Sequence, residues 1–170
     1  MNIIKYPARE EWKSIVERPH LDVSQLNATV KEVLDKVRNN GDQAVIEYEK
    51  AFDHVELHNL AVTEAEMEEA EKLTSKELKD ALILAHENIA LFHHSQKFTA
   101  SKVETRPGVT CWQKSIPIQK VGLYIPGGTA PLFSTVLMLA TPAKIAGCSE
   151  IVLCTPPNRE GKVNPAILIA

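Results

Sequence analysis

VGLYIPGGTAPLFSTVLMLATPAKIAGCSEIVLC, residues 121–154, is the stretch that decides the fold of this chain. Its first residues, 121–125, form a short apolar run rich in β-branched and aromatic side chains, which is typical of a strand buried on both faces. Apolar residues then recur at helical spacing over 133–145, and Gly147 follows where helices often end in a left-handed residue. A second apolar run, 151–154, predicts another strand. This order predicts a βαβ unit with parallel strands and a right-handed crossover.

The loop after the first predicted strand is the candidate ligand site. Ligands of α/β proteins bind at the carboxyl ends of strands, which here means residues 126–134. Gly127 and Gly128 would let a ligand approach the backbone at a helix N-terminus, and Thr129 adds a hydroxyl group. The loop matches neither the dinucleotide fingerprint nor a Walker A loop, because no lysine follows the glycines. A purely structural turn would explain the glycines equally well.

Tyr124 is the penultimate residue of the first predicted strand, which ends at this loop. Its ring could stack on a nucleotide base, or its hydroxyl group could form a hydrogen bond with a ligand. It could also be an aromatic residue of the core, and the pattern alone narrowly favours the core.

No group of residues in the sequence indicates catalysis or metal binding. The glutamates within residues 64–71 are expected on a solvated helix face. His86, His93 and His94 lack the spacing of a helical metal-binding pair, so we interpret them as surface histidines. The sequence contains no H-E-x-x-H, no G-x-S-x-G and no cysteine with a base nearby. The residues by themselves therefore predict no catalytic residue and no metal ligand.

Composition describes an ordinary globular protein of 170 residues, with 44% hydrophobic residues, 24% charged residues and a net charge of -3. This balance gives no electrostatic reason to expect nucleic acid or an anionic membrane as a partner. No apolar run approaches the roughly 20 residues that span a bilayer, and no cleavable signal pattern appears, so a cytoplasmic location is the default expectation. Cys111, Cys148 and Cys154 lack metal-ligand spacing and are interpreted as reduced thiols of the core.

Residues 1–105 are predicted to be a helical region, which begins with a peripheral arm at residues 1–20. Four further helices are expected. The first begins at Asp22 or Ser24 and runs to residue 39, where Asn40-Gly41 ends it, and the second spans 42–52. The third spans 63–73, where Thr63 and Glu66 form a capping box, and the fourth spans 75–96. The last helix carries an apolar seam from Leu78 to Phe92, which is typical of a helix that packs lengthwise on a neighbour or on another subunit.

Residues 106–170 are predicted to be the first part of an α/β domain. Arg106-Pro107-Gly108 predicts a turn, and an alternating strand over 109–118 is expected to lead into the sheet. Asn164 and Pro165 begin a helix that stops at Ala170 after little more than one turn. We therefore expect the sequence to be a truncated piece of a longer protein.

Residues 121–157, VGLYIPGGTAPLFSTVLMLATPAKIAGCSEIVLCTPP, resemble the corresponding segment of the histidinol dehydrogenase family, and NNGDQAVIEYEKAFD, residues 39–53, strengthens the match. The resemblance implies a zinc-containing, NAD-dependent homodimer that oxidises L-histidinol to L-histidine through an aldehyde. In that family, zinc orients the substrate, and a glutamate–histidine pair supplies the general base and acid. These residues lie in the family's later half, and nothing in residues 1–170 matches them.

The resemblance also assigns one cofactor contact, because the tyrosine of the family's V-G-L-Y segment maps onto Tyr124. Gly127, Gly128 and Thr129 are our own additions to this NAD site. The implied fold is α/β, with dimer-packing helices in residues 1–105 and then the start of an incomplete Rossmann-like parallel sheet. The chain alone is expected to be inactive, and its unpaired sheet edge is expected to favour self-association.

Two other functions remain open. The chain could be a non-catalytic binding or interaction module that uses the glycine loop and the long helix, residues 78–96. It could also be an unrelated phosphate-binding α/β protein, although the missing lysine in the loop argues against that.

Overall fold

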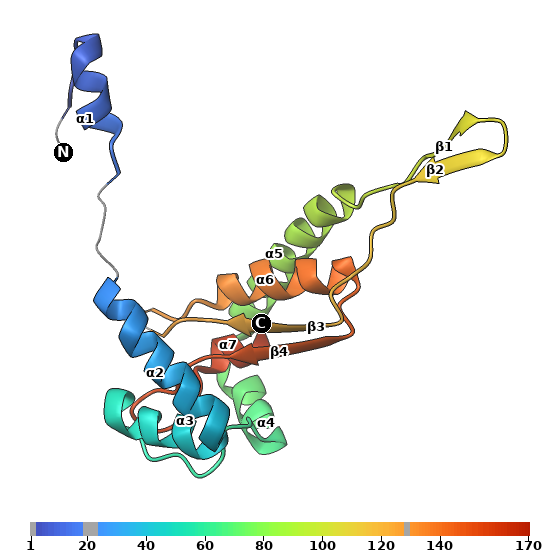
Figure 1. Cartoon of the computed structure of the whole chain (residues 1–170). Helices are drawn as coiled ribbons and strands as arrows, with labels where there is room; N and C mark the ends of the chain where they lie inside the picture. The colour runs from blue at the N-terminus through green and yellow to red at the C-terminus, as the bar shows by residue number, and fades with distance from the viewer. Residues whose placement is uncertain (1–2, 19–23, 128–129) are drawn as a thin grey trace. The chain divides into compact units, whose positions relative to one another are not determined.

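The structure is a computed structural model that describes residues 3–18, 24–127 and 130–170. Its contacts divide the chain into two compact units, Met1–Ala44 and Val45–Ala170. Figure 1 labels the helices and strands in chain order. The βαβ unit and the candidate ligand site both belong to the second unit.

The first unit consists of helices. A short 3-10 helix, Arg9–Glu11, continues into α1 (Trp12–Val16), and α2 spans Ser24–Asn40. As predicted, Asn40-Gly41 ends α2, and Gly41 has a positive φ of 56°. Three apolar side chains of α2, namely Leu26, Val30 and Leu34, are exposed.

The helix predicted over residues 42–52 is interrupted. Helix α3 (Asp42–Tyr48) passes into a π-helical turn, η2 (Glu49–Asp53), which ends at His54 in the left-handed conformation. The ring of Tyr48 stacks on that of Phe52, with centroids 5.4 Å apart. The sequence gives no sign of this change in helical pitch.

Helices α4 (Glu64–Leu73) and α5 (Lys76–Ser95) begin at the predicted caps. The Glu66 backbone N–H donates to Thr63 Oγ1 over 3.3 Å, and the Thr63 N–H donates to Glu66 Oε2 over 2.8 Å. This reciprocal pair is the predicted capping box. At α5, the Leu78 N–H donates to Ser75 Oγ over 3.3 Å.

Helix α5 packs on α6 (Phe133–Ala146) through the predicted apolar seam. Leu82 is buried, and Ala85 and Ile89 are half-buried. Phe92 departs from the prediction because 62% of its surface is exposed.

The predicted βαβ unit is confirmed. Strand β3 (Lys120–Tyr124) pairs in parallel with β4 (Glu150–Cys154), and α6 connects them. Helix α6 ends at Gly147, where φ is 93°, and the N–H groups of Gly147 and Cys148 donate to the carbonyls of Lys144 and Ala143 in a Schellman motif. Figure 1 shows α6 beside this sheet.

The core lies on one face of the β3–β4 sheet. Ile125, Val136 and Ile167 form its buried cluster, and Leu153 packs against them. Side chains alternate along both strands between half-buried and exposed. The expectation of strands buried on both faces is therefore wrong, because α6 covers only the face that carries Leu153.

The strand predicted over residues 109–118 is shorter and pairs elsewhere. Strand β2 (Val109–Trp112) pairs antiparallel with β1 (Lys102–Arg106), and the two form a sheet separate from β3–β4 (Figure 1). The tight turn at Pro107-Gly108, where Gly108 has a φ of 81°, favours a partner nearby in sequence. The expectation that this strand leads into the main sheet is wrong.

The chain continues past β4 to α7 (Pro165–Ile169), which packs on α4. Its predicted start is confirmed, because the Ala166 N–H donates to Asn164 Oδ1 over 2.9 Å. Lys162 Nζ pairs with Glu69 Oε2 of α4 at 2.7 Å. Helices α4 and α5, which precede residue 105, pack on α7 and α6, which follow it, within the second unit. The division of the chain into a helical region and an α/β domain at residue 105 stays a prediction.

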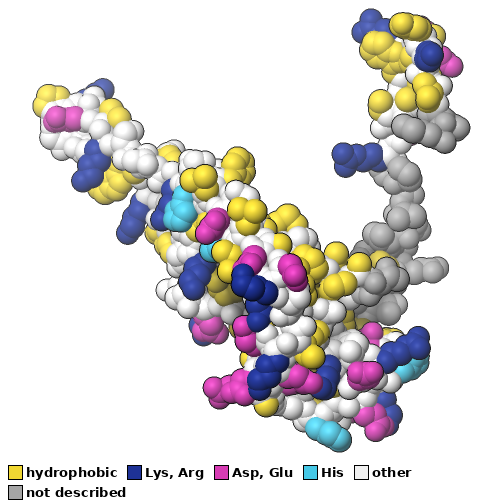
Figure 2. All heavy atoms as spheres, turned by 180° about the vertical axis from the view of Figure 1, so that it is seen from behind, with side chains coloured by type: hydrophobic (Ala, Val, Ile, Leu, Met, Phe, Trp, Pro, Cys, Tyr) yellow, Lys and Arg dark blue, Asp and Glu magenta, His cyan; other side chains and the backbone are white. Residues whose placement is uncertain are grey.

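The surface of the described residues mixes apolar and charged side chains, as Figure 2 shows for one face of the molecule. Among these residues, no helix combines the length and the apolar character that crossing a bilayer requires.

Candidate functional site

The candidate site lies at the carboxyl ends of β3 and β4. Tyr124 is the last residue of β3 and stands opposite Cys154, the last residue of β4. The Ile125 N–H donates to the Cys154 carbonyl over 2.9 Å, so the parallel pairing extends one residue further. The rigid ends of two paired strands therefore position this site.

Tyr124 is available to a ligand. Ile125 is fully buried, and because successive strand residues point to opposite faces, the Tyr124 side chain lies on the face that α6 does not cover. Its exposed fraction is 63%. The interpretation of Tyr124 as a core residue, which the pattern narrowly favoured, is wrong.

Gly127 packs closely against the segment that follows β4. A Cβ atom at Gly127 would lie 2.6 Å from Cγ of Pro156, which is closer than carbon atoms approach. This contact supports the structural interpretation of this glycine, and its proposed contact with a ligand stays a prediction. Gly128 and Thr129, the other two predicted loop residues, lie outside the described residues.

The first turn of α6 follows this loop in the sequence. Leu132 precedes the helix, and among the described residues no side chain caps it. The Thr135 N–H donates to the Leu132 carbonyl over 3.0 Å, and Ser134 is exposed. A helix start without an acidic cap keeps its partial positive charge, which favours an anionic group nearby.

A cavity of about 620 Å³ lies beside the end of β4, and two of its polar atoms have no hydrogen-bond partner within the described residues. These atoms are Oγ1 of Thr155, directly after β4, and Oε2 of Glu49 in η2. Burial, and secondarily the charge of Asp53, raises the pKa of Glu49 above its ordinary value of 4.5. Sequence reasoning missed both residues, because neither the π-helical turn nor the cavity has a signal in the sequence.

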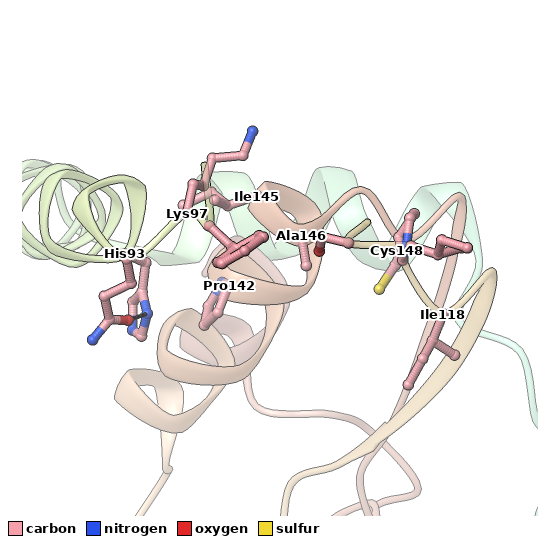
Figure 3. A pocket seen from close by; sticks show the side chains of 12 residues that line it. His93, Lys97, Ile118, Pro142, Ile145, Ala146 and Cys148 are labelled. Atoms are coloured by element: carbon pink, nitrogen blue, oxygen red, sulfur yellow. Dashed lines mark hydrogen bonds between the residues drawn. The ribbon is translucent and has the colours of Figure 1, made fainter. Parts of the chain in front are cut away.

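A second cavity, of about 540 Å³, is shown in Figure 3. It lies between the ends of α5 and α6 and residues 115–118. His93 Nδ1 lies 2.8 Å from Oε1 of Gln96, and Lys97 and the half-buried Cys148 also line the cavity. His93 is itself half-buried, whereas His86 and His94 are exposed as interpreted from the sequence.

Potential metal ligands are dispersed. Among the described residues, no three His, Cys, Asp or Glu side chains form a group that could hold a metal ion. The three cysteines are free thiols, as predicted. Cys111 and Cys154 are exposed, so their assignment to the core is wrong: Cys111 lies on the exposed β1–β2 hairpin, and Cys154 lies on the uncovered face of β4.

Comparisons with known proteins agree with the sequence resemblance. The sequence profile of the histidinol dehydrogenase family matches residues 16–170. Histidinol dehydrogenase of Bacteroides thetaiotaomicron is 61% identical over 170 residues, which cover 100% of this chain and 40% of that protein. Histidinol dehydrogenase of Vibrio vulnificus is 54% identical over 145 residues, which cover 85% of this chain and 34% of that protein.

A solved structure gives the same result. The crystal structure of histidinol dehydrogenase from Elizabethkingia anophelis superposes with a TM-score of 0.91 at 46% sequence identity. The match covers 96% of this chain and 38% of that one, so this chain spans about two fifths of the length of such relatives. On the profile match, the identity and the superposition together, the chain belongs to the histidinol dehydrogenase family.

Proposed function

We propose that this chain contributes one wall of the NAD site in an enzyme that oxidises L-histidinol to L-histidine through the aldehyde. The observation that carries the proposal is the 61% identity to a histidinol dehydrogenase along the whole chain. NAD would accept hydride in two successive transfers. The alternative of a non-catalytic module has no comparable support.

Within this proposal, Tyr124 contacts NAD. Its exposed ring, held at a strand end by the pairing of β3 with β4, fits a planar cofactor ring that stacks on it. Gly127, Gly128 and Thr129 are proposed to complete this wall at the start of α6. The role of the chain's own residues is to bind and orient the cofactor.

We place the metal and proton-transfer chemistry elsewhere in the enzyme. The described residues contain no group of side chains that fits zinc. The proposed zinc ligands and the glutamate–histidine pair belong to the part of the relatives' length that this chain does not span.

The proposed assembly is a cytoplasmic homodimer whose small-molecule substrate is L-histidinol. The net charge of -3 gives no electrostatic reason to expect nucleic acid or an anionic membrane as a partner. The α5 face that carries Leu84 and Leu91, exposed by 59% and 75%, is the proposed dimer contact.

The cofactor proposal is tested in a chimera in which these residues replace the matched part of the Bacteroides thetaiotaomicron enzyme. Tyr124→Ala should raise the KM for NAD about 10-fold, because stacking of a base on an aromatic ring contributes about 1–3 kcal/mol. Tyr124→Phe keeps the ring and should have a smaller effect.

Tyr6 provides the matched control, because it is 99% exposed and lies in the first unit. Tyr6→Ala should leave the KM for NAD unchanged. Equal KM values for Tyr124→Ala and the unsubstituted chimera would show that Tyr124 does not contact the cofactor.

A further inference from the structure

The β1–β2 hairpin lies in a segment whose side chains all face solvent. Every residue from 94 to 120 is exposed, and Val103 and Trp112 of the hairpin are exposed by 54% and 59%. The two strands pair with each other in a sheet separate from β3–β4 (Figure 1). A hairpin of two strands is only marginally stable in water, so this element needs a further strand or layer.

Contacts within the hairpin hold its shape. At the turn, the Gly108 N–H donates to Glu104 Oε1 over 2.8 Å. At the other end, Lys102 Nζ lies 5.7 Å from the centre of the Trp112 ring. Because these contacts join the two strands to each other, the hairpin presents its edges as a preformed unit.

The two edges of the hairpin differ in charge. Strand β1 carries Lys102, Glu104 and Arg106 at alternate positions, and charges on an edge strand discourage pairing with another strand. Strand β2 reads Val-Thr-Cys-Trp, which has no charge and favours strand structure. Among the described residues, no strand pairs with the other side of β2, which we call the open edge.

A strand of the same sequence fits the open edge. Two copies of β2 that pair antiparallel around a two-fold axis present identical surfaces to each other. No charges face each other in such a pair. Full pairing of β1 with its own copy would instead place Glu104 opposite the partner's Glu104, and like charges directly opposite each other destabilise a sheet.

The length of the pairing selects its register. With the two-fold axis at Cys111, residues 109–113 of the two copies pair, and all five are uncharged. The chain after this segment is free to continue, because residues 113–118 belong to no helix, strand or turn. An axis at Thr110 would reach the Pro107-Gly108 turn sooner and would pair fewer residues.

We propose that the open edge of β2 pairs antiparallel with β2 of a second copy of this chain, so that two hairpins form one four-stranded sheet across the subunit interface. Cys111 lies opposite the partner's Cys111. The proposal rests on the proposed homodimer and names a contact in it. This contact continues from the proposed α5 contact, because the hairpin follows α5 in the sequence.

Cys111 provides a direct test, because its thiol is free and exposed. Residues directly opposite each other in antiparallel strands have Cα atoms about 4.5–5.5 Å apart, which a disulfide spans. Oxidation of the chimera by copper phenanthroline should link Cys111 to the partner's Cys111, as identified by peptide mass spectrometry, at a rate independent of protein concentration. A rate that rises with concentration would indicate chance collisions and overturn the proposal.

The control moves the thiol to β1, as Val103→Cys in a chimera that also carries Cys111→Ser. Val103 pairs with Cys111 within the hairpin, so the two copies of position 103 would lie three strand spacings apart, about 14 Å. A disulfide does not span that distance, and the link should form at least 10-fold more slowly. Equal rates at the two positions would contradict pairing through β2.

A second measurement determines the dissociation constant of the chimera dimer by analytical ultracentrifugation. Thr110→Asp should raise it about 5-fold, because the substitution replaces the Thr110–Trp112 cross-strand pairs with a charged edge. Thr105→Asp is the matched control, since Thr105 is an exposed threonine of β1, and it should leave the constant unchanged. Equal constants for Thr110→Asp and the unsubstituted chimera would overturn the proposal.

The oligomeric state of the chimera separates this proposal from the one on which it rests. A monomeric chimera would contradict the homodimer and the β2 contact together. A dimeric chimera in which Cys111 stays unlinked would leave the homodimer intact and overturn the β2 contact alone.

Discussion

At the scale of single residues, Gly127 packs closely against Pro156, and the side chain of Tyr124 is exposed to solvent. The Gly127 backbone lies against Pro156, and its φ is outside the left-handed region, so the need for glycine there is steric. Tyr124 is held on the sheet face that α6 does not cover, because Ile125, which follows it, is buried on the other face. The loop thus combines a packing constraint with an accessible aromatic ring.

Gly127→Ala should destabilise the chain by about 1–3 kcal/mol, as is usual when an added methyl group overpacks a contact. Urea unfolding measures the change. Gly122→Ala is the matched control, because no atom lies within 4 Å of its Cβ position, and it should change stability by less than about 0.5 kcal/mol. If the two variants unfold alike, the close packing on Pro156 is not present in solution.

Sequence reasoning located the loop residues but could not separate their roles. A glycine after a strand is compatible with a ligand or with a neighbouring side chain, and Pro156 is distant in sequence from Gly127. The exposure of Tyr124 depends on which face α6 covers, and an apolar run such as residues 121–125 does not specify this. Both points depend on tertiary contacts.

At the scale of elements, the helix ends were predicted correctly from residues close in sequence. The capping box at Thr63, the Schellman motif at Gly147 and the cap at Asn164 each depend on residues close in sequence, and all three are confirmed. Strand β2 shows the limit, because alternation predicts a strand but does not identify its partner. The π-helical turn η2 also lacked a signal, and it places Glu49 in a cavity.

Glu49, in the π-helical turn η2, should make the stability of the chain depend on pH. Its pKa is raised by burial and then by Asp53, so its contribution to stability is complete below pH 4.5 and is lost as the pH rises through the folded-state pKa. Glu49→Gln remains neutral and should unfold at higher urea than the unsubstituted chain at pH 7, with the difference vanishing near pH 4.

Asp53→Asn is the control for this prediction, because it removes only the smaller cause of the pKa shift. Its stabilising effect at pH 7 should be smaller than that of Glu49→Gln. A difference between Glu49→Gln and the unsubstituted chain that does not vary with pH would exclude titration of Glu49 as its source.

At the scale of the whole molecule, the fold class was predictable because it depends on one continuous stretch. Residues 121–154 contain both strands and the helix of the βαβ unit, and the parallel pairing follows from their order. The contacts that join α5 with α6 and α4 with α7 connect distant segments, and periodicity alone does not predict such pairs. The uncovered face of the sheet likewise follows only from the assembled structure.

The central claim is that this chain supplies a cofactor-binding wall and that catalysis requires the rest of the histidinol dehydrogenase fold. Its most direct test measures NADH formation from L-histidinol, NAD and zinc by the chain alone and by the chimera with the Bacteroides thetaiotaomicron enzyme. We predict turnover by the chimera and none by the chain alone. Turnover by the chain alone would contradict the claim, as would a folded chimera that does not form NADH.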